Sequence, residues 1–181
     1  MLLIISDASV LIDIECGELT SAMFSLPLQF AVPDILFDEE LSERHGHLLG
    51  FGLISKPMSG ELVGEAYALH QKYTKASVND LLALTLAKYE NCQLLTGDKA
   101  LRDVANELTV DVHGTLWLVE QMLREGKIAI EVARVAFERM KLFGSRLPWS
   151  KVEEMLMNNG WCNGDWQKHM AGNAAQGFIG K

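Results

Sequence analysis

Short apolar runs alternate with stretches of helical spacing through the first 113 residues or so. The apolar runs are too short for helices and predict buried strands. They cover residues 2–5, 30–32, 92–95 and 110–112. Between the runs, apolar side chains recur every three or four positions, as they do on one face of a helix. Such helices are expected over residues 10–14, 34–41, 60–73, 77–87 and 99–108. This alternation predicts a three-layer α/β/α sandwich around a central, mostly parallel sheet.

The pattern becomes wholly helical after Gly114. Helices are expected over residues 116–124, 128–143 and 149–157, where they would pack on the flank of the sheet. From residue 158 the composition shifts to Asn, Gly, Ala and Gln without periodicity, which predicts an irregular tail. We therefore expect one domain over residues 1–157, including the helices from about 115, followed by a tail over residues 158–181.

The composition supports a single globular domain in a reducing compartment. A chain of 181 residues with 49% hydrophobic side chains can bury a core of its own. The apolar start is too short to span a bilayer and lacks a signal-peptide pattern, so no membrane association is expected. Its three cysteines, Cys16, Cys92 and Cys162, show no CxxC spacing. This pattern argues against a disulfide framework or a zinc site and favours the cytoplasm.

Net charge limits how the chain can bind nucleic acid. The formal charge is -8, the wrong sign for binding that relies on neutralising phosphates with basic side chains. Divalent cations held by carboxylates would supply local positive charge instead.

Acidic residues recur at strand ends or helix starts. Asp7 and Asp98 each follow a predicted strand, and Glu39 or Glu40 lies in the helix after the second strand. Asp80 falls in the first turn of a helix that Ser77 would cap. A parallel sheet would bring these carboxylates to one edge, where repulsion between them favours a bound cation. Oxygen ligands without thiol or imidazole select Mg²⁺ or Mn²⁺, which suits phosphodiester hydrolysis.

These segments resemble the ordered motifs of PIN-domain proteins, many of which are VapC-like ribonuclease toxins of type II toxin-antitoxin systems. The resemblance spans roughly residues 1–115, with a fainter likeness beyond. It rests on residues 7–12, 32–41, 79–84 and 94–102. It implies a PIN-like fold with a helical C-terminal extension and a metal-dependent endoribonuclease that hydrolyses RNA. It also implies a small antitoxin partner, which would block the acidic cleft, and a homodimer.

The resemblance assigns roles to single residues. Asp7, Asp80 and Asp98 match the metal-binding acids of the family, and Ser9 and Thr96 match their usual hydroxyl neighbours. For the fourth acid, the distance from Pro33 favours Glu39, and Glu40 is the substitute. Successive residues of an α-helix point about 100° apart, so we expect only one of the two to face the site.

Three further residues near Asp98 are weaker candidates for the site. Lys99 and Arg102 are candidates for contacts with substrate phosphate, although basic residues at such places often only balance nearby acids. Asp103 is either an outer ligand or a solvated helix charge.

Other interpretations remain open for the same residues. Asp7 could serve only as a helix N-cap, Asp80 could interact with the helix dipole, and Asp98 could shape a turn. A PIN fold could also act as a non-catalytic scaffold that binds protein or RNA. A haloacid-dehalogenase-like phosphatase or a receiver domain is disfavoured, because Ser9 stands where the phosphatase needs a second Asp and the receiver's Asp-Asp pair is missing.

Overall fold

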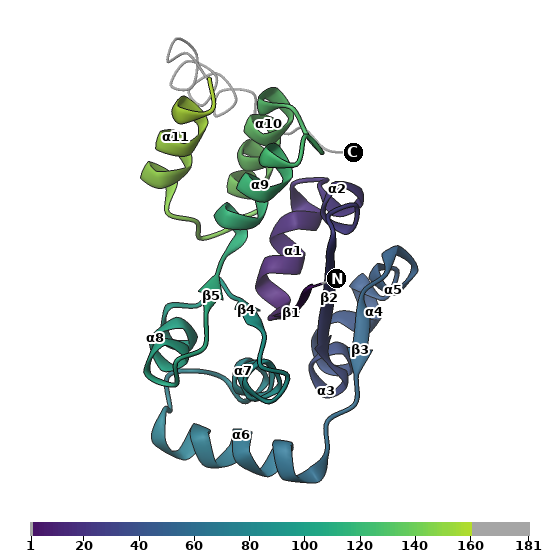
Figure 1. Ribbon diagram of the computed structural model, residues 1–181, viewed down its shortest axis with the longest axis vertical. Helices are drawn as coiled ribbons and strands as arrows, with labels where there is room; N and C mark the ends of the chain where they lie inside the picture. Colours follow the sequence, from purple (N-terminus) through teal and green to yellow (C-terminus); the bar gives the residue numbers. More distant parts are fainter. Residues whose placement is uncertain (1, 161–181) are drawn as a thin grey trace, which may run out of the picture.

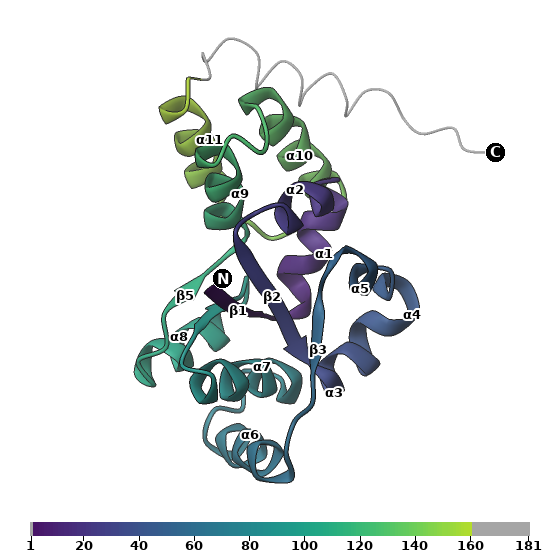
Figure 2. The same ribbon diagram turned by 45° about the vertical axis from the view of Figure 1, so that its right-hand side comes forward.

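The computed structural model describes residues 2–160 and centres on a five-stranded sheet in the order β3-β2-β1-β4-β5. Every strand pair in this sheet is parallel. Helices cover both faces (Figures 1 and 2). The strands are β1 (Leu2–Ser6), β2 (Leu28–Pro33), β3 (Ile54–Lys56), β4 (Gln93–Leu95) and β5 (Val112–His113). The predicted α/β sandwich is confirmed, with a sheet that is entirely parallel.

The helices follow the predicted order, with short additions. They are α1 (Ala8–Cys16), α2 (Thr20–Phe24), α3 (Asp34–Leu36), the π-helix η1 (Phe37–Leu41), α4 (Ser42–His45), α5 (Leu48–Phe51), α6 (Gly60–Lys72), α7 (Val78–Tyr89), α8 (Lys99–Glu107), α9 (Thr115–Arg124), α10 (Ile130–Leu142) and α11 (Trp149–Asn158). The sequence pattern missed α2, α5 and β3, which have only three to five residues each. Elements of this length carry too few positions for a period to show.

Helix α7 is the central helix of one face of the sheet. It contacts β1, β2 and β4, while α6 packs on its outer side. Seven consecutive residues, from Leu81 to Ala87, are therefore buried. Helix α1 lies on the opposite face (Figures 1 and 2).

The C-terminal helices pack on other helices. Helix α9 contacts α1 and α2, α10 contacts α1, and α11 contacts α10. We expected these helices on the flank of the sheet, but the structure places them over α1, where Ala136 and Met140 of α10 approach Gly17 at the end of α1. Helix α11 ends at Asn158, and the predicted tail lies outside the described residues beyond Gly160.

The strand order creates a crevice beside β1. The chain passes from β1 to β2 on one side of the sheet, and β4 lies on the other side of β1. Ser6 pairs with Leu95, so Asp7 and Thr96 come next in register at the carboxyl ends of these two strands. Ligands of open parallel sheets bind where the order reverses in this way. No helix within residues 2–160 has the length and apolar character needed to cross a bilayer.

Candidate active site

Three hydrogen bonds fix the position of Asp7 at the crevice. It caps α1, and its Oδ1 accepts hydrogen bonds from the Val10 backbone N–H at 3.0 Å and from Ser9 Oγ at 2.8 Å. Its own N–H donates to the carbonyl oxygen of Leu95 at 2.9 Å. The residue is only 2% exposed, so its carboxylate has little contact with solvent.

Burial makes the charge on Asp7 costly. It raises the pKa of Asp7 from 3.8 to about 6, although hydrogen bonds from Thr96, Val10 and Ser9 act in the opposite direction. The nearby negative charge of Asp80 raises this pKa further. Asp7 and Asp80 therefore share one electrostatic environment, in which a cation would stabilise the ionised form of Asp7.

Asp80 lies at the start of α7 in the predicted capping box. Ser77 Oγ accepts from the Asp80 N–H at 3.0 Å, and Asp80 Oδ2 accepts from the Ser77 N–H at 3.2 Å. These reciprocal bonds fix the first turn of α7, and with it the half-buried carboxylate of Asp80.

Glu39 and Glu40 both reach the neighbour of Asp80. Asn79 Nδ2 donates to Glu39 Oε2 at 3.0 Å and to Glu40 Oε1 at 2.7 Å. Both glutamates are exposed, and that only one of them faces the other acids stays a prediction. Residues 37–41 form a π-helix, whose wider turn leaves successive side chains less than the α-helical angle of about 100° apart. Asn79, which precedes Asp80, is a contact of both glutamates that the sequence motifs contained but did not single out.

Thr96 connects Asp98 to Asp7. Asp98 caps α8 by accepting from the Leu101 N–H at 2.7 Å, and its own N–H donates to Thr96 Oγ1 at 2.9 Å. The same Thr96 side chain hydrogen-bonds to Asp7. The hydroxyl groups of Ser9 and Thr96 thus lie among the acids, as the resemblance implied.

A cleft of about 230 Å³ opens at this edge, and Ser9, Gly97 and Asp98 help to line it. Its lining also includes Asp13, which the sequence analysis did not consider. Burial raises the pKa of Asp13, while hydrogen bonds from Ser145 and Thr115 lower it. Asp13 follows Ser9 by four positions on α1, so both lie on one face of the helix. The spacing of four positions between Ser9 and Asp13 was the sequence signal that could have identified Asp13.

The acidic residues suit a hydrated divalent cation. Within residues 2–160, no three His, Cys, Asp or Glu side chains form a group that could hold a metal ion. Mg²⁺, however, usually binds one or two carboxylates and keeps several waters, without a cage made wholly of protein ligands. Asp7 and Asp80, whose negative charge contributes to the raised pKa of Asp7, are the candidates for such carboxylates. Asp7, Asp80 and Asp98 also carry the capping roles considered above, and capping leaves further carboxylate lone pairs available.

Comparison with known proteins decides the family. A family model described as DUF3368, PIN domain, matches residues 3–160. The chain belongs to the PIN-domain family. Proteins of this family are generally nucleases, and they generally use divalent metal ions. Among solved structures, a PilT N-terminus domain protein from the hyperthermophilic archaeon Sulfolobus solfataricus P2 is similar at 16% identity and a TM-score of 0.44. The match covers 68% of this chain and 94% of that one. No curated protein matches the chain significantly.

The two basic candidates of this PIN domain lie beside the acids. Lys99 and Arg102 line a cavity of about 580 Å³ that shares Gly97 with the acidic cleft. Arg102 Nη2 also donates to the carbonyl oxygen of Thr96 at 2.7 Å. Asp103 is exposed on α8 and does not line either space.

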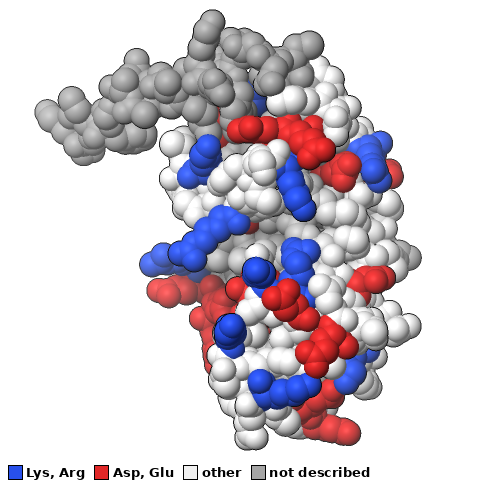
Figure 3. All heavy atoms as spheres, turned by 90° about the vertical axis from the view of Figure 1, so that its left-hand side faces the viewer, with Lys and Arg blue, Asp and Glu red and all other residues white. Residues whose placement is uncertain are grey.

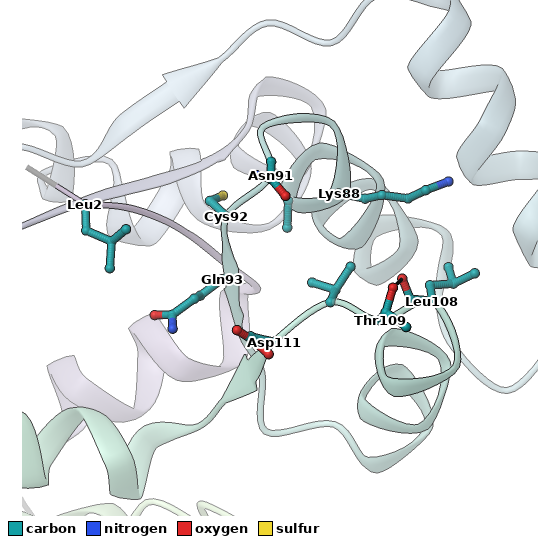
Figure 4. A pocket seen from close by; sticks show the side chains of 10 residues that line it. Leu2, Lys88, Asn91, Cys92, Gln93, Leu108, Thr109 and Asp111 are labelled. Carbon is teal, nitrogen blue, oxygen red and sulfur yellow. Dashed lines mark hydrogen bonds between the residues drawn. The ribbon is translucent and has the colours of Figure 1, made fainter.

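The PIN domain has another cavity, of about 450 Å³, at the opposite edge of the sheet (Figure 4). Leu2 and Gln93, the first residues of β1 and β4, help to line it. Asp111 is the one carboxylate in this lining. The acids predicted for catalysis therefore lie at the other edge, which separates this cavity from the candidate active site.

Proposed function

We propose that this PIN domain is a Mg²⁺- or Mn²⁺-dependent endoribonuclease that hydrolyses RNA phosphodiester bonds. The observation that carries the proposal is the burial of the Asp7 carboxylate, within range of the charge of Asp80, at the point where the strand order reverses. Such a carboxylate retains its proton to about pH 6 unless a cation compensates its charge. Asp98 lines the cleft that adjoins the cavity of Lys99 and Arg102.

The proposal gives each residue a role. Asp7 and Asp80 would hold the ion together with Asp98 and Glu39, or Glu40 as its substitute. A bound ion of this kind activates water and neutralises the charge that develops on a phosphate. The carboxylates themselves are oriented by the chain: Ser9 and Thr96 hold Asp7, and Ser77 holds Asp80. Lys99 and Arg102 would bind substrate phosphate.

The proposal extends to the biological role. The resemblance to VapC-like proteins supports a toxin that acts in the cytoplasm, forms a homodimer and is neutralised by a small antitoxin. A basic side chain of the antitoxin could enter the acidic cleft, because an opposite charge would lower the cost of the buried carboxylates. In that case, expression of the unaltered chain should arrest growth, and expression of Asp98→Asn should not.

Cleavage of a mixed single-stranded RNA tests the chemistry. The unaltered chain should cleave the RNA when Mn²⁺ or Mg²⁺ is added and should be inactive in EDTA. Asp7→Asn and Asp98→Asn should lower the rate by about 100-fold or more, since each removes a charge from the site. Asp111→Asn, at the opposite edge of the sheet, should cleave normally. Cleavage that persists in both site variants would contradict the enzyme and favour a scaffold role.

A further inference from the structure

The cavity of about 580 Å³ lies between β5, the start of α8, α9 and the start of α11. It adjoins the acidic cleft, and the two spaces share Gly97, Arg146 and Leu147 in their linings. The C-terminal helical extension supplies one wall. A ligand in this cavity could therefore extend into the cleft that Asp13 and Asp98 line.

Positive charge is concentrated in this cavity although the whole chain is acidic. Its lining contains four basic side chains, which are Lys99, Arg102, Arg146 and Lys151. Glu120 is the one carboxylate in the lining, and it already pairs with Arg124 at 3.4 Å. Within residues 2–160, no ion pair engages any of the four basic side chains. Lys and Arg side chains gather across the middle of the corresponding face of the molecule (Figure 3).

Two aromatic rings provide a flat surface in the same cavity. The rings of His113 and Trp117 stack with centroids 4.0 Å apart and planes 11° apart, and both residues line the cavity. Burial lowers the pKa of His113, with a further contribution from the positive charge of Arg102. The imidazole is therefore neutral at pH 7, which suits stacking against a neutral nucleobase.

Arg102 links the cavity to Asp98 through two hydrogen bonds. Its guanidinium donates to the Thr96 carbonyl, and the Thr96 hydroxyl binds the N–H of Asp98. A Cβ added at Gly114 would lie 3.1 Å from Arg102 Nη2 and 3.2 Å from the Thr96 oxygen. The absence of a side chain at Gly114 thus leaves room for this contact.

We propose that this cavity binds the nucleotides of single-stranded RNA that flank the phosphate at the acidic cleft. The RNA backbone follows the four basic side chains, and one base stacks against the aromatic pair. The strand is single because its bases must be unstacked to reach aromatic side chains. This assignment rests on the proposed nuclease function for the position of the scissile phosphate.

Fluorescence anisotropy with a short, labelled, mixed-sequence RNA tests the basic side chains. Ca²⁺ replaces Mn²⁺ in this assay to suppress cleavage. The double variant Arg146→Ala/Lys151→Ala should raise the Kd by about tenfold or more and reduce the slope of log K against log salt by about 1.4, as expected for two lost contacts on a single strand. The matched control is Lys88→Ala/Lys127→Ala, which removes two charges outside this cavity and should leave the Kd within about twofold.

The stacking surface has its own test. Trp117→Ala should raise the Kd by about 5- to 150-fold, the range for the loss of one base stack, and should leave the salt slope unchanged. Trp117 also packs against the core, so circular dichroism must show that the variant is folded. If it is not folded, the double basic variant decides the proposal.

Three outcomes would overturn the assignment. They are undetectable binding by the unaltered chain, an unchanged Kd in the double basic variant, and tighter binding of oligoglutamate than of RNA with loss of peptide binding in that variant. The last result would assign the cavity to an acidic protein partner. RNA binding that needs the cavity, without any Mn²⁺-dependent cleavage, would contradict the nuclease proposal alone.

Discussion

At the scale of single residues, the candidate site depends on the cost of one buried charge. Asp7 receives hydrogen bonds from Ser9, Val10 and Thr96, yet burial outweighs them and its pKa rises to about 6. An acid whose pKa is higher in the folded chain than in the unfolded chain stabilises the fold at low pH. That contribution is lost as the pH rises through about 6.

Substitution of Asp7 should therefore change how stability depends on pH. From pH 4 to pH 7.5 in EDTA, the stability of Asp7→Asn relative to the unaltered chain should increase by about 2 kcal/mol, because the carboxyl of Asp7 has its pKa raised from 3.8 to about 6. Urea denaturation at several pH values measures this difference. Asp111→Asn, at an exposed position, should show no such trend. A flat difference for Asp7→Asn would show that its carboxylate has an ordinary pKa.

A substitution at Gly114 tests the contact between Arg102 and Thr96. In Gly114→Ala, the new methyl group would crowd the Arg102 guanidinium and the Thr96 carbonyl, so their hydrogen bond should weaken. We expect a loss of about 1 kcal/mol in the free energy of unfolding and weaker binding of RNA.

Gly64→Ala provides the control for Gly114→Ala, because a Cβ at this exposed position inside α6 meets nothing within 4 Å. It should stabilise the chain by about 0.5–1 kcal/mol and leave RNA binding unchanged. If Gly114→Ala behaved in the same way, the proposed crowding would be wrong.

At the scale of elements, short sequence motifs correctly predicted features that depend on hydrogen bonds between residues close together in the chain. The capping box at Ser77 and the position of Asp80 in the first turn of α7 were read correctly, because each depends on residues four positions apart or fewer. The π-helix over residues 37–41 could not be read in this way. Its apolar and acidic residues fit an α-helix equally well, and only packing of the surrounding chain selects the wider turn.

The capping box offers a prediction that separates stability from function. Ser77→Ala removes the acceptor for the Asp80 N–H and should destabilise the chain by about 1 kcal/mol. Ser59→Ala removes the equivalent cap of α6 and should cost a similar amount. Only Ser77→Ala should also slow RNA cleavage, because Asp80 loses its fixed orientation. Equal cleavage rates in the two variants would exclude a role for this box in catalysis.

At the scale of the whole molecule, the sequence predicted the alternation of strands and helices but could not predict the order of the strands in the sheet. Asp7 and Thr96 are neighbours because β4 pairs with β1, a contact between segments about 90 residues apart that no local pattern encodes. The position of Arg146 at the cleft was not predicted, for a similar reason. It reaches the cleft only because α9 and α10 pack over α1, and those helices were expected elsewhere.

Cation binding should raise the stability of the whole chain. At a Mn²⁺ concentration about 100 times the Kd, the gain is about 2.7 kcal/mol. For a chain of this size that gain raises the Tm by about 5–11 °C. Differential scanning fluorimetry with and without Mn²⁺ measures the shift. Asp7→Asn should abolish most of it, and Asp111→Asn should retain it. A shift that is equal in the two variants would place the cation elsewhere.

The wide turn over residues 37–41 has a further consequence for which sequence changes this segment can accept. A π-helix accommodates one more residue than the α-helical path between the same ends. Deletion of a single residue there could restore regular spacing and leave α3 and α4 in place. It would also return the two glutamates to the α-helical angle of about 100°, which should weaken the hydrogen bond from Asn79 to one of them. Paired glutamates at this position should therefore accompany a lengthened turn, and relatives with a shorter segment should keep a single acid.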